Sequence, residues 1–175
     1  RSRADLVPAA SPPLAKALAR HTPRPIYVFK TLPACDLYYQ TAPCRSADGG
    51  FRFIYAASGF NYRHLNDIAA PAIARIMKEY GPRVHFIFMG GELEAGEPEQ
   101  RTFLTGRLPY YDFVKKFAAV TADAALAPLD QSPFSLCKSD LKYREYGPPG
   151  LFGIYSNTPV HSASVRPGET RLLSN

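Results

Sequence analysis

The chain has 175 residues, and 46% of them are hydrophobic, which is enough for one domain with a real core or for one domain with a piece of another. Lys and Arg total 21 against 15 acidic residues, giving a net charge of +6, and the basic residues are scattered singly. Scattered charge argues against nucleic acid as a partner. No apolar run reaches the roughly 18 residues that a membrane helix needs.

The first fifty residues predict a helix, a short strand and a linker. Ser11 can cap a helix that has Pro12 at its first position and continues to Arg20. The apolar run 26–29 then predicts a strand. Residues 40–50 contain Pro43 and the Asp-Gly-Gly run, and they are typical of a linker.

From Phe51 onward the pattern alternates between strand and helix. Strands are expected at 51–57, 84–89, 102–105, 122–127, 151–155 and 171–173, and helices at 68–80, at 110–120 and from Ser139. Residues 58–67 and 92–101 are expected to be loops. This alternation predicts an α/β domain with an open parallel sheet flanked by helices. The loops after the strands, and the helix start at Ser139, are expected to meet at one edge of that sheet, where such sheets bind ligands.

The helix start near Ser139 carries the strongest chemical signal. Ser139 or Asp140 can cap the helix, yet Lys138 and Lys142 crowd an end that normally prefers acidic residues. Free amides, the helix dipole and two cations together predict an anion site, and a phosphate suits it best. Glu145 is either an ion-pair partner of Lys142 or an acceptor for a sugar hydroxyl, and spacing alone favours the ion pair.

The loop 58–67 is a second, weaker candidate. Ser58-Gly59 directly after a buried strand lets the backbone approach a ligand closely, and Arg63 and His64 could reach an anion. The remaining histidines promise less: His85 lies within a strand pattern, and His21 and His161 have no evident partners. No D-x-D pair or metal-ligand spacing is present, so we expect neither a metal ion nor another cofactor.

Three motifs, in this order, resemble the donor-binding domain of the group 1 (GT4-like) glycosyltransferases of the GT-B class. They are FIYAASG with HLND at 53–67, TGRLPYY with ADAALAPL at 105–129, and FSLCKSDLKYREYGPPG at 134–150, which is similar to the family's F-N-x-x-K-S-x-x-K-x-x-E-Y signature. The resemblance covers 51–160. It implies a Rossmann-like fold, the C-terminal half of a GT-B fold, with 1–50 as the end of an acceptor domain and the linker, and 51–175 as a donor domain truncated at its C-terminal end.

The resemblance also implies a function. The chain would belong to a metal-independent enzyme that moves a sugar from a nucleoside-diphosphate sugar to a glycan or lipid-linked acceptor, as in polysaccharide biosynthesis. The general base and the acceptor site belong to the other domain, so we expect this chain alone to bind nucleotide without transferring sugar. The developing charge of the leaving diphosphate would be stabilised electrostatically.

Matching positions supply the expected site. Glu145 corresponds to the residue that binds the ribose hydroxyls, and Ser139, Asp140 and Leu141 to the turn that holds the diphosphate. The complete set of expected substrate-binding residues is Ser58, Gly59, Arg63, Gly106, Arg107, Leu108, Lys138, Ser139, Asp140, Leu141, Lys142 and Glu145.

Two features leave other interpretations open. Cys137 stands where the family often has a glutamate that contacts the donor sugar, which is compatible with a degenerate GT-B domain that serves as a nucleotide-binding or interaction module. A flavodoxin- or receiver-like domain has the same alternation but lacks support from an acidic cluster.

The three cysteines show no disulfide framework, which favours a reducing compartment. We therefore expect a cytoplasmic protein, with association at the inner face of the membrane as a further hypothesis.

Overall fold

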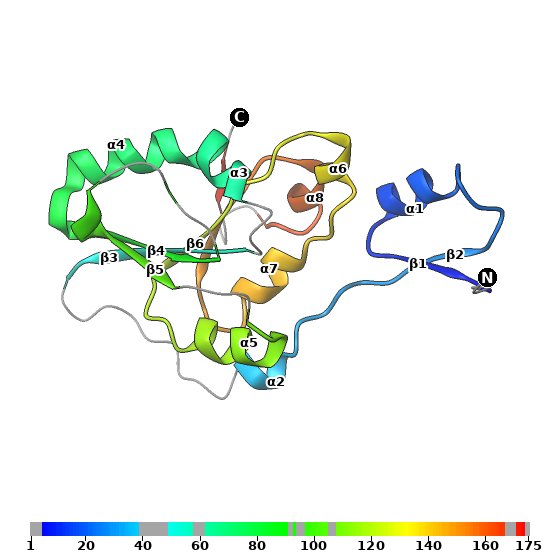
Figure 1. Ribbon diagram of the computed structural model, residues 1–175, viewed down its shortest axis with the longest axis horizontal. Coiled ribbons are helices and arrows are strands. Elements are labelled where there is room, and N and C mark those ends of the chain that lie inside the picture. Colours follow the sequence, from blue (N-terminus) through cyan, green and yellow to red (C-terminus); the bar gives the residue numbers. More distant parts are fainter. Residues whose placement is uncertain are drawn as a thin grey trace.

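Six strands lie side by side in one parallel sheet in the computed structural model of this chain (Figure 1). They are β3 (Phe51–Ala56), β4 (Val84–Met89), β5 (Arg101–Leu104), β6 (Ala124–Ala127), β7 (Phe152–Ser156) and β8 (Arg171–Leu173). In the central strands the positions nearest the carboxyl ends are apolar without alternation, as at 53–56 and 86–89, because helices cover both faces of the sheet there. All six expected strands are confirmed, as is the α/β class.

The strand order is β5-β4-β3-β6-β7-β8. Counted from β3, this is the 3-2-1-4-5-6 order of doubly wound, Rossmann-like sheets. The chain moves outward from β3 to β5, then returns to the other side of β3 and continues outward to β8. The direction therefore reverses between β3 and β6, and this is the position at which such sheets place their ligands.

The structure describes residues 5–38, 49–57, 62–90, 93, 97–104, 108–166 and 171–173. Most of the expected linker at 40–50, much of the expected loop at 92–101, and the expected site residues Ser58, Gly59, Gly106 and Arg107 lie outside these ranges.

Helices cover the two faces of the sheet with separate cores. On one face, α4 (Ala70–Tyr80) packs Ile73 and Met77 against Phe86 and Phe88. On the other face lie α5 (Tyr110–Ala118), α2 (Cys35–Tyr38) and α7 (Leu141–Tyr146) (Figure 1). Their apolar side chains belong to a second cluster. The amphipathic pattern of α4 and α5 explains this arrangement, since each presents one apolar stripe.

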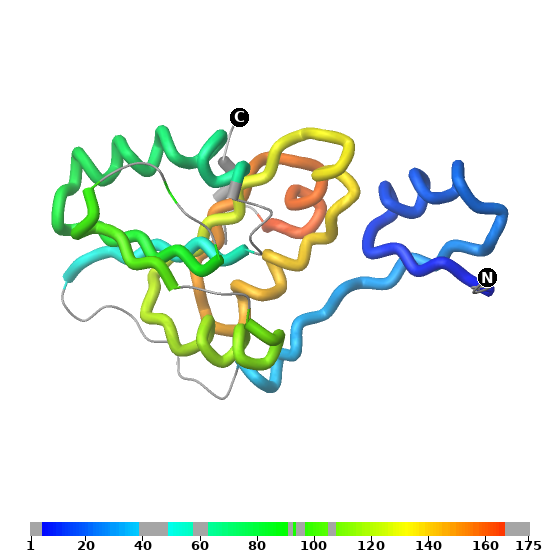
Figure 2. Tube along the Cα trace, viewed as in Figure 1, coloured from blue at the N-terminus to red at the C-terminus, as the bar shows by residue number. Residues whose placement is uncertain are grey.

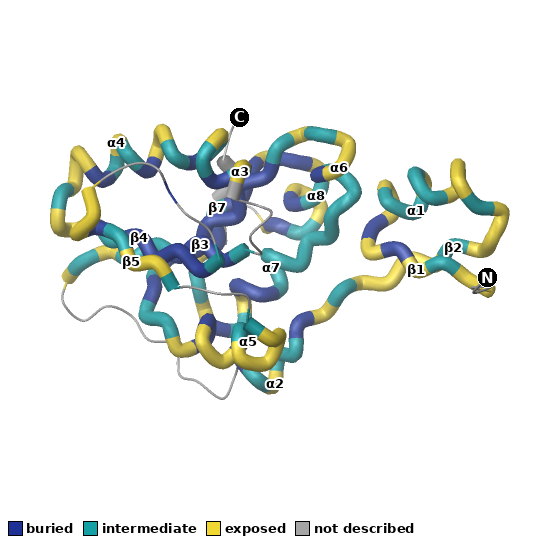
Figure 3. Tube along the Cα trace, viewed as in Figure 1, coloured by how far each residue is buried: buried dark blue, intermediate teal, exposed yellow. Residues whose placement is uncertain are grey.

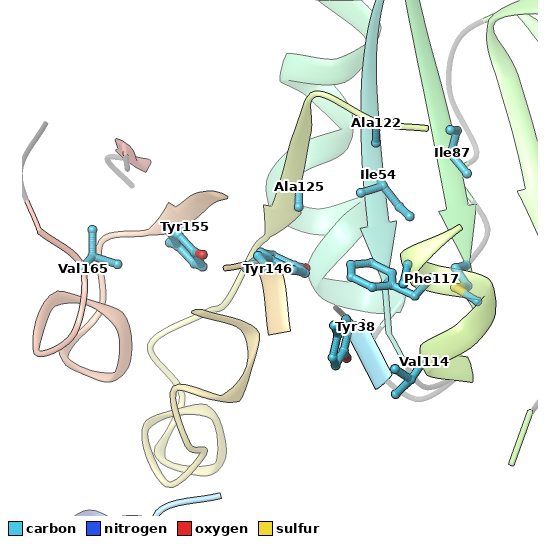
Figure 4. Packing of buried hydrophobic residues seen from close by; sticks show 14 residues of the cluster. Tyr38, Ile54, Ile87, Val114, Phe117, Ala122, Ala125, Tyr146, Tyr155 and Val165 are labelled. Carbon is cyan, nitrogen blue, oxygen red and sulfur yellow. The ribbon is translucent and has the colours of Figure 1, made fainter. Parts of the chain in front are cut away.

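Aromatic rings form the centre of the second core (Figure 4). Phe117 of α5 stacks on Tyr146 with ring centroids 6.0 Å apart, and Tyr146 stacks on Tyr155 at the same distance. Tyr38 meets Phe117 edge to face at 6.1 Å. Tyr38 precedes the expected linker, so the core of the main sheet takes in a residue from the segment before it.

A small unit precedes the main sheet. It consists of β1 (Val7–Ala9), α1 (Pro12–Leu18) and β2 (Ile26–Val28), with β1 and β2 paired in parallel. The predicted cap is confirmed, because Ser11 Oγ accepts a hydrogen bond from the Leu14 amide at 3.2 Å. The same hydroxyl donates to the Cys137 carbonyl oxygen at 2.7 Å, which ties the unit to the main body.

This unit is set apart from the sheet in the trace of the chain (Figure 2), and an extended stretch connects it to α2. Its α1 has no buried residue, whereas the central strands of the main sheet are buried (Figure 3). Most of the chain's hydrophobic burial therefore lies in the main sheet and its helices.

Helix formation after β3 begins earlier than the apolar stripe predicts. Residues expected to be a loop form α3 (Tyr62–His64) and a wider π-helical turn (Leu65–Ala69) that leads directly into α4, so Asp67 lies inside a helix. The Ala70 amide bonds to the Leu65 carbonyl, five residues back. Pro71 lacks an amide hydrogen, and the wider turn accommodates this gap in the ladder.

Five further short helical segments among the described residues have no counterpart in the prediction. They are α2, α6 (Pro133–Leu136), α8 (Pro159–Ser162) and the single 3-10 turns at Gly81–Arg83 and Pro98–Gln100. Each has four residues or fewer, which is too short for an apolar stripe to show a helical period.

Candidate functional site

A pocket of about 240 Å³ opens at the carboxyl ends of β3 and β6, where the strand order reverses. Strand ends supply one wall, and the segment from Lys138 to Tyr146 supplies the other. The lining residues are Tyr55, Ala56, Ala57, His64, Leu126, Ala127, Pro128, Leu129, Lys138, Ser139, Leu141, Lys142, Tyr146 and His161. The prediction that the segment after β6 and the start of α7 face one crevice is confirmed, and Ala57, directly after β3, lines the same pocket.

Backbone geometry at the start of α7 differs from the predicted cap. Asp140 occupies the N-cap position, but its carboxylate makes no capping bond. Instead, its two oxygens accept hydrogen bonds from Arg144 at 3.0 and 2.7 Å, and Ser164 Oγ donates to Oδ2. Burial works against the charge, yet these bonds prevail and lower the pKa of Asp140. Asp140 therefore braces α7 and is absent from the pocket lining.

Lys142 and Glu145 form an ion pair, with 2.7 Å between Nζ and Oε2. Glu145 is only 4% exposed, and it does not line the pocket, whereas Lys142 does. The Lys142 amino group also lies 5.8 Å from the ring centroids of Phe113 and Tyr146. Of the two interpretations of Glu145, the ion pair is the one that the contacts show, and it offsets the charge of Lys142.

Lys138 brings a second cation to the pocket. Its amino group lies 5.2 Å from the centroid of the Phe134 ring, which is itself 74% exposed. Burial lowers the pKa of Lys138, and the nearby Asp130 carboxylate opposes that shift. A partly desolvated ammonium interacts more strongly with an anion than one in bulk water.

His64 reaches the pocket from the helical turn after β3 and lies near two polar groups. Its Nε2 is 3.3 Å from Ser135 Oγ and 3.4 Å from Asp130 Oδ2. In a Ser-His-Asp triad the serine and the carboxylate contact opposite ring nitrogens. Here both contact the same nitrogen, so this cluster lacks the geometry of a nucleophilic triad.

Asp130 is held ionised by its neighbours. Hydrogen bonds from Ser135 and Ser132 lower the pKa of Asp130 to about 2, against a smaller opposing effect of burial. Ser132 also caps α6, its Oγ accepting from the Ser135 amide at 3.2 Å. The short α6 is thereby fixed beside His64 and Lys138, two residues that line the pocket, and its Phe134 is exposed.

Two buried rings, those of Tyr146 and His161, line the pocket. Tyr146 Oη donates to the Leu126 carbonyl at 2.8 Å, which joins α7 to the end of β6. His161 is 3% exposed, its Nδ1 lies 3.3 Å from the Ser156 carbonyl, and burial lowers its pKa. The expectation that His161 has no partner is wrong. The sequence contains no sign of its role, because α8 brings it to the pocket from twenty residues beyond Leu141.

The expected site residues divide into three groups. Lys138, Ser139, Leu141 and Lys142 meet in the pocket. Arg63 is exposed on α3 and Leu108 packs against the second core, so neither lines the pocket. The others, apart from Asp140 and Glu145 described above, are Ser58, Gly59, Gly106 and Arg107, and they lie outside the described residues.

Residues that the sequence interpretation missed are Tyr146 and His161. The segment after β6 was expected at the crevice, but none of its residues was named as a site residue, and Pro128 and Leu129 line the pocket. Within the described part of the chain, no group of three or more metal-ligating side chains comes together. Across the same residues, every helix falls short of the length and apolar character required to cross a bilayer.

Comparison with models of known families and with curated proteins gave no match to this chain.

Proposed function

We propose that this chain binds the donor substrate of a glycosyltransferase, which transfers a sugar from a nucleoside-diphosphate sugar to a glycan or lipid-linked acceptor. The observation that carries the proposal is the pocket at the strand-order reversal, lined by Lys138, Ser139 and Lys142. These residues belong to the motif that resembles the nucleotide-sugar signature. Two things therefore support the proposal: the position of the pocket in the sheet and the residue types that line it.

The charges of the pocket suit a diphosphate. Lys138 and Lys142 would contact its oxygens, and the Ser139 hydroxyl would donate a further hydrogen bond. As the bond between the sugar and the diphosphate breaks, negative charge accumulates on the leaving group, and cations already in place lower the barrier. In this proposal the reaction uses no resident metal ion, as the family resemblance implies.

The size of the pocket limits what it would enclose. Its volume of about 240 Å³ is below the roughly 300–1,000 Å³ of pockets that enclose a drug-sized ligand. A nucleoside diphosphate would therefore place its diphosphate inside, with the nucleoside against the rim. Phe134 is an exposed aromatic ring beside Lys138 at this rim.

Glu145 has a different place in this proposal from the one that the resemblance implies. Its carboxylate holds Lys142, so it would act first by positioning that amino group. Contact with ribose hydroxyls would require Glu145 to leave the ion pair. The acceptor and the general base would come from a second domain, and the enzyme would act in the cytoplasm or at the inner face of the membrane.

A module without transferase activity is the second candidate. The specific observation in its favour is that Glu145 is buried and paired, while Cys137 occupies the position of the other expected glutamate. Such a domain would have a Rossmann-like fold and a weak pocket or none for nucleoside diphosphates.

Calorimetric titration with UDP, GDP, ADP and dTDP tests the proposal. We expect saturable binding of one of the four, weakened about tenfold or more by Lys138→Gln, because a hydrogen bond to a charged group contributes roughly 1.5–3 kcal/mol. Glu145→Gln should weaken the binding of the same nucleotide. Lys116→Gln, which removes an exposed charge on α5, is the matched control and should bind as the parent does. Absence of binding by all four nucleotides would refute the donor-site proposal.

A further inference from the structure

A second hollow lies at the opposite edge of the sheet, where β3 and β4 begin. Its volume is about 400 Å³, larger than that of the pocket at the carboxyl edge. The lining residues are Gly50, Phe51, Arg52, Pro82, Arg83, Val84, His85, Ile87, Thr102 and Thr121. The six residues of β3 separate the two hollows by roughly 17–20 Å, at about 3.3 Å per residue.

Basic side chains gather in this hollow. Arg52 of β3 is the register partner of His85 of β4, so the two side chains lie next to each other on one face of the sheet. Burial lowers the pKa of His85, and the nearby positive charge of Arg52 lowers it further. Arg83 approaches from the turn before β4. Three basic side chains from two adjoining segments therefore line one concave surface.

Hydrogen bonds fix part of this lining in place. His85 Nε2 lies 2.7 Å from Thr102 Oγ1 on β5. The Arg83 Nε donates to the Tyr80 carbonyl at 3.3 Å, and its guanidinium lies 5.3 Å from the centroid of the Tyr80 ring. These contacts hold Arg83 by one edge of its guanidinium, a group that has five N–H donors in all.

Acidic side chains are absent from the described lining of this hollow. Asp123 lies beside the start of β3, where its Oδ2 accepts a hydrogen bond from the Arg52 amide at 2.8 Å. That bond directs the carboxylate to the backbone at the start of β3. The lining thus combines two guanidinium groups, an imidazole and two threonine hydroxyls.

We infer that this hollow binds a small organic phosphate, at a site separate from the pocket at the strand-order reversal. A phosphate group offers several acceptor oxygens in a compact tetrahedron, and arginine recognises it through paired hydrogen bonds. The hollow exceeds the size of a bare phosphate, which leaves room for the organic part near Thr102 and Thr121. This inference is independent of the proposed glycosyltransferase function.

Two-dimensional amide NMR with ribose 5-phosphate as the probe, and ribose as the uncharged control, tests the inference. We expect saturable shifts of the Gly50, Arg52 and Arg83 amides with ribose 5-phosphate and none with ribose. Arg52→Gln and Arg83→Gln should each weaken binding about tenfold. Arg75→Gln, an equal loss of charge on the exposed side of α4, should leave the affinity unchanged.

The residues whose amide signals shift distinguish this inference from the proposed function. Shifts confined to Ser139 and Lys142 would place the phosphate in the other pocket and overturn the inference, while supporting the donor-site proposal. Equal affinity in the Arg52→Gln and Arg83→Gln proteins would overturn it as well. The spectra of the free variants show whether each is folded, and two separate substitutions guard against misfolding of one.

Discussion

Breaking the Lys142–Glu145 pair should cost more from the lysine side than from the glutamate side. Glu145 is 4% exposed, while the side chain of Lys142 is 30% exposed. Lys142→Met leaves a buried carboxylate without its partner, which costs about 3 kcal/mol. Glu145→Gln leaves an amino group that reaches water, and the loss is about 1.5 kcal/mol, the low end for a hydrogen bond to a charged group.

The double variant isolates the interaction between the two side chains. Additivity of these two losses predicts about 4.5 kcal/mol, but a pair that contacts directly should couple by about 1.5 kcal/mol. The double variant should then lose about 3 kcal/mol, which is no more than Lys142→Met alone. The reason is that removal of the lysine already abolishes the contact that the glutamate makes.

Urea unfolding followed by far-ultraviolet circular dichroism measures these free energies of unfolding. The slope of the free energy of unfolding against urea concentration should be the same for all variants, because the surface exposed on unfolding hardly changes. Lys78→Met on the exposed side of α4 is the control, and it should change the free energy by less than about 0.5 kcal/mol. Additive losses in the double variant would refute the view that Glu145 mainly positions Lys142.

Two further predictions concern the strand ends and the mouth of the pocket. Gly90→Ala should destabilise the fold by more than about 2 kcal/mol, because Gly90 has φ of +82° and a β-carbon there would collide with the Ala57 carbonyl oxygen. Gly49→Ala is the control, since Gly49 also has positive φ but open space around it. Equal losses of stability for the two variants in thermal unfolding would show that the collision is not the cause. The Asp130 carboxyl, with a folded pKa of about 2 against 3.8 for the free side chain, contributes stability that is full above pH about 4 and is lost as the pH falls toward about 2. Asp130→Asn should therefore flatten the decline in stability across that window in urea unfolding, and an unchanged decline would show that other carboxyls are responsible.

The apolar pattern, together with the glycine and proline residues that end each element, was sufficient to locate the strands of the sheet. The runs at β3 and β4 are each six residues long, and glycine or proline lies close to both, so few alternatives to a buried strand exist. The helix at Ser11 was equally accessible, because a serine cap followed by Pro12 is a local signal. Such features depend on neighbouring residues alone.

The pocket required more than local signals. The motif around Lys138 and Lys142 pointed to an anion site, and the edge of the sheet on which it lies followed from the alternation of strands and helices. His161 and Tyr146 were missed because their roles depend on packing between segments that are distant in the sequence. The pairing of Asp140 with Arg144 was missed because a cap and an ion pair are equally compatible with the same local residues.

By itself, the sequence determined the α/β class, six strands and the two lysines at the start of α7, because periodicity and capping operate over a few residues. Only the tertiary structure decided that Glu145 is buried against Lys142, that His161 joins the pocket, and that Arg52, Arg83 and His85 line a second hollow. These outcomes depend on strand order and register, which are set by how side chains pack across the sheet. Packing of that kind leaves no periodic trace along the chain.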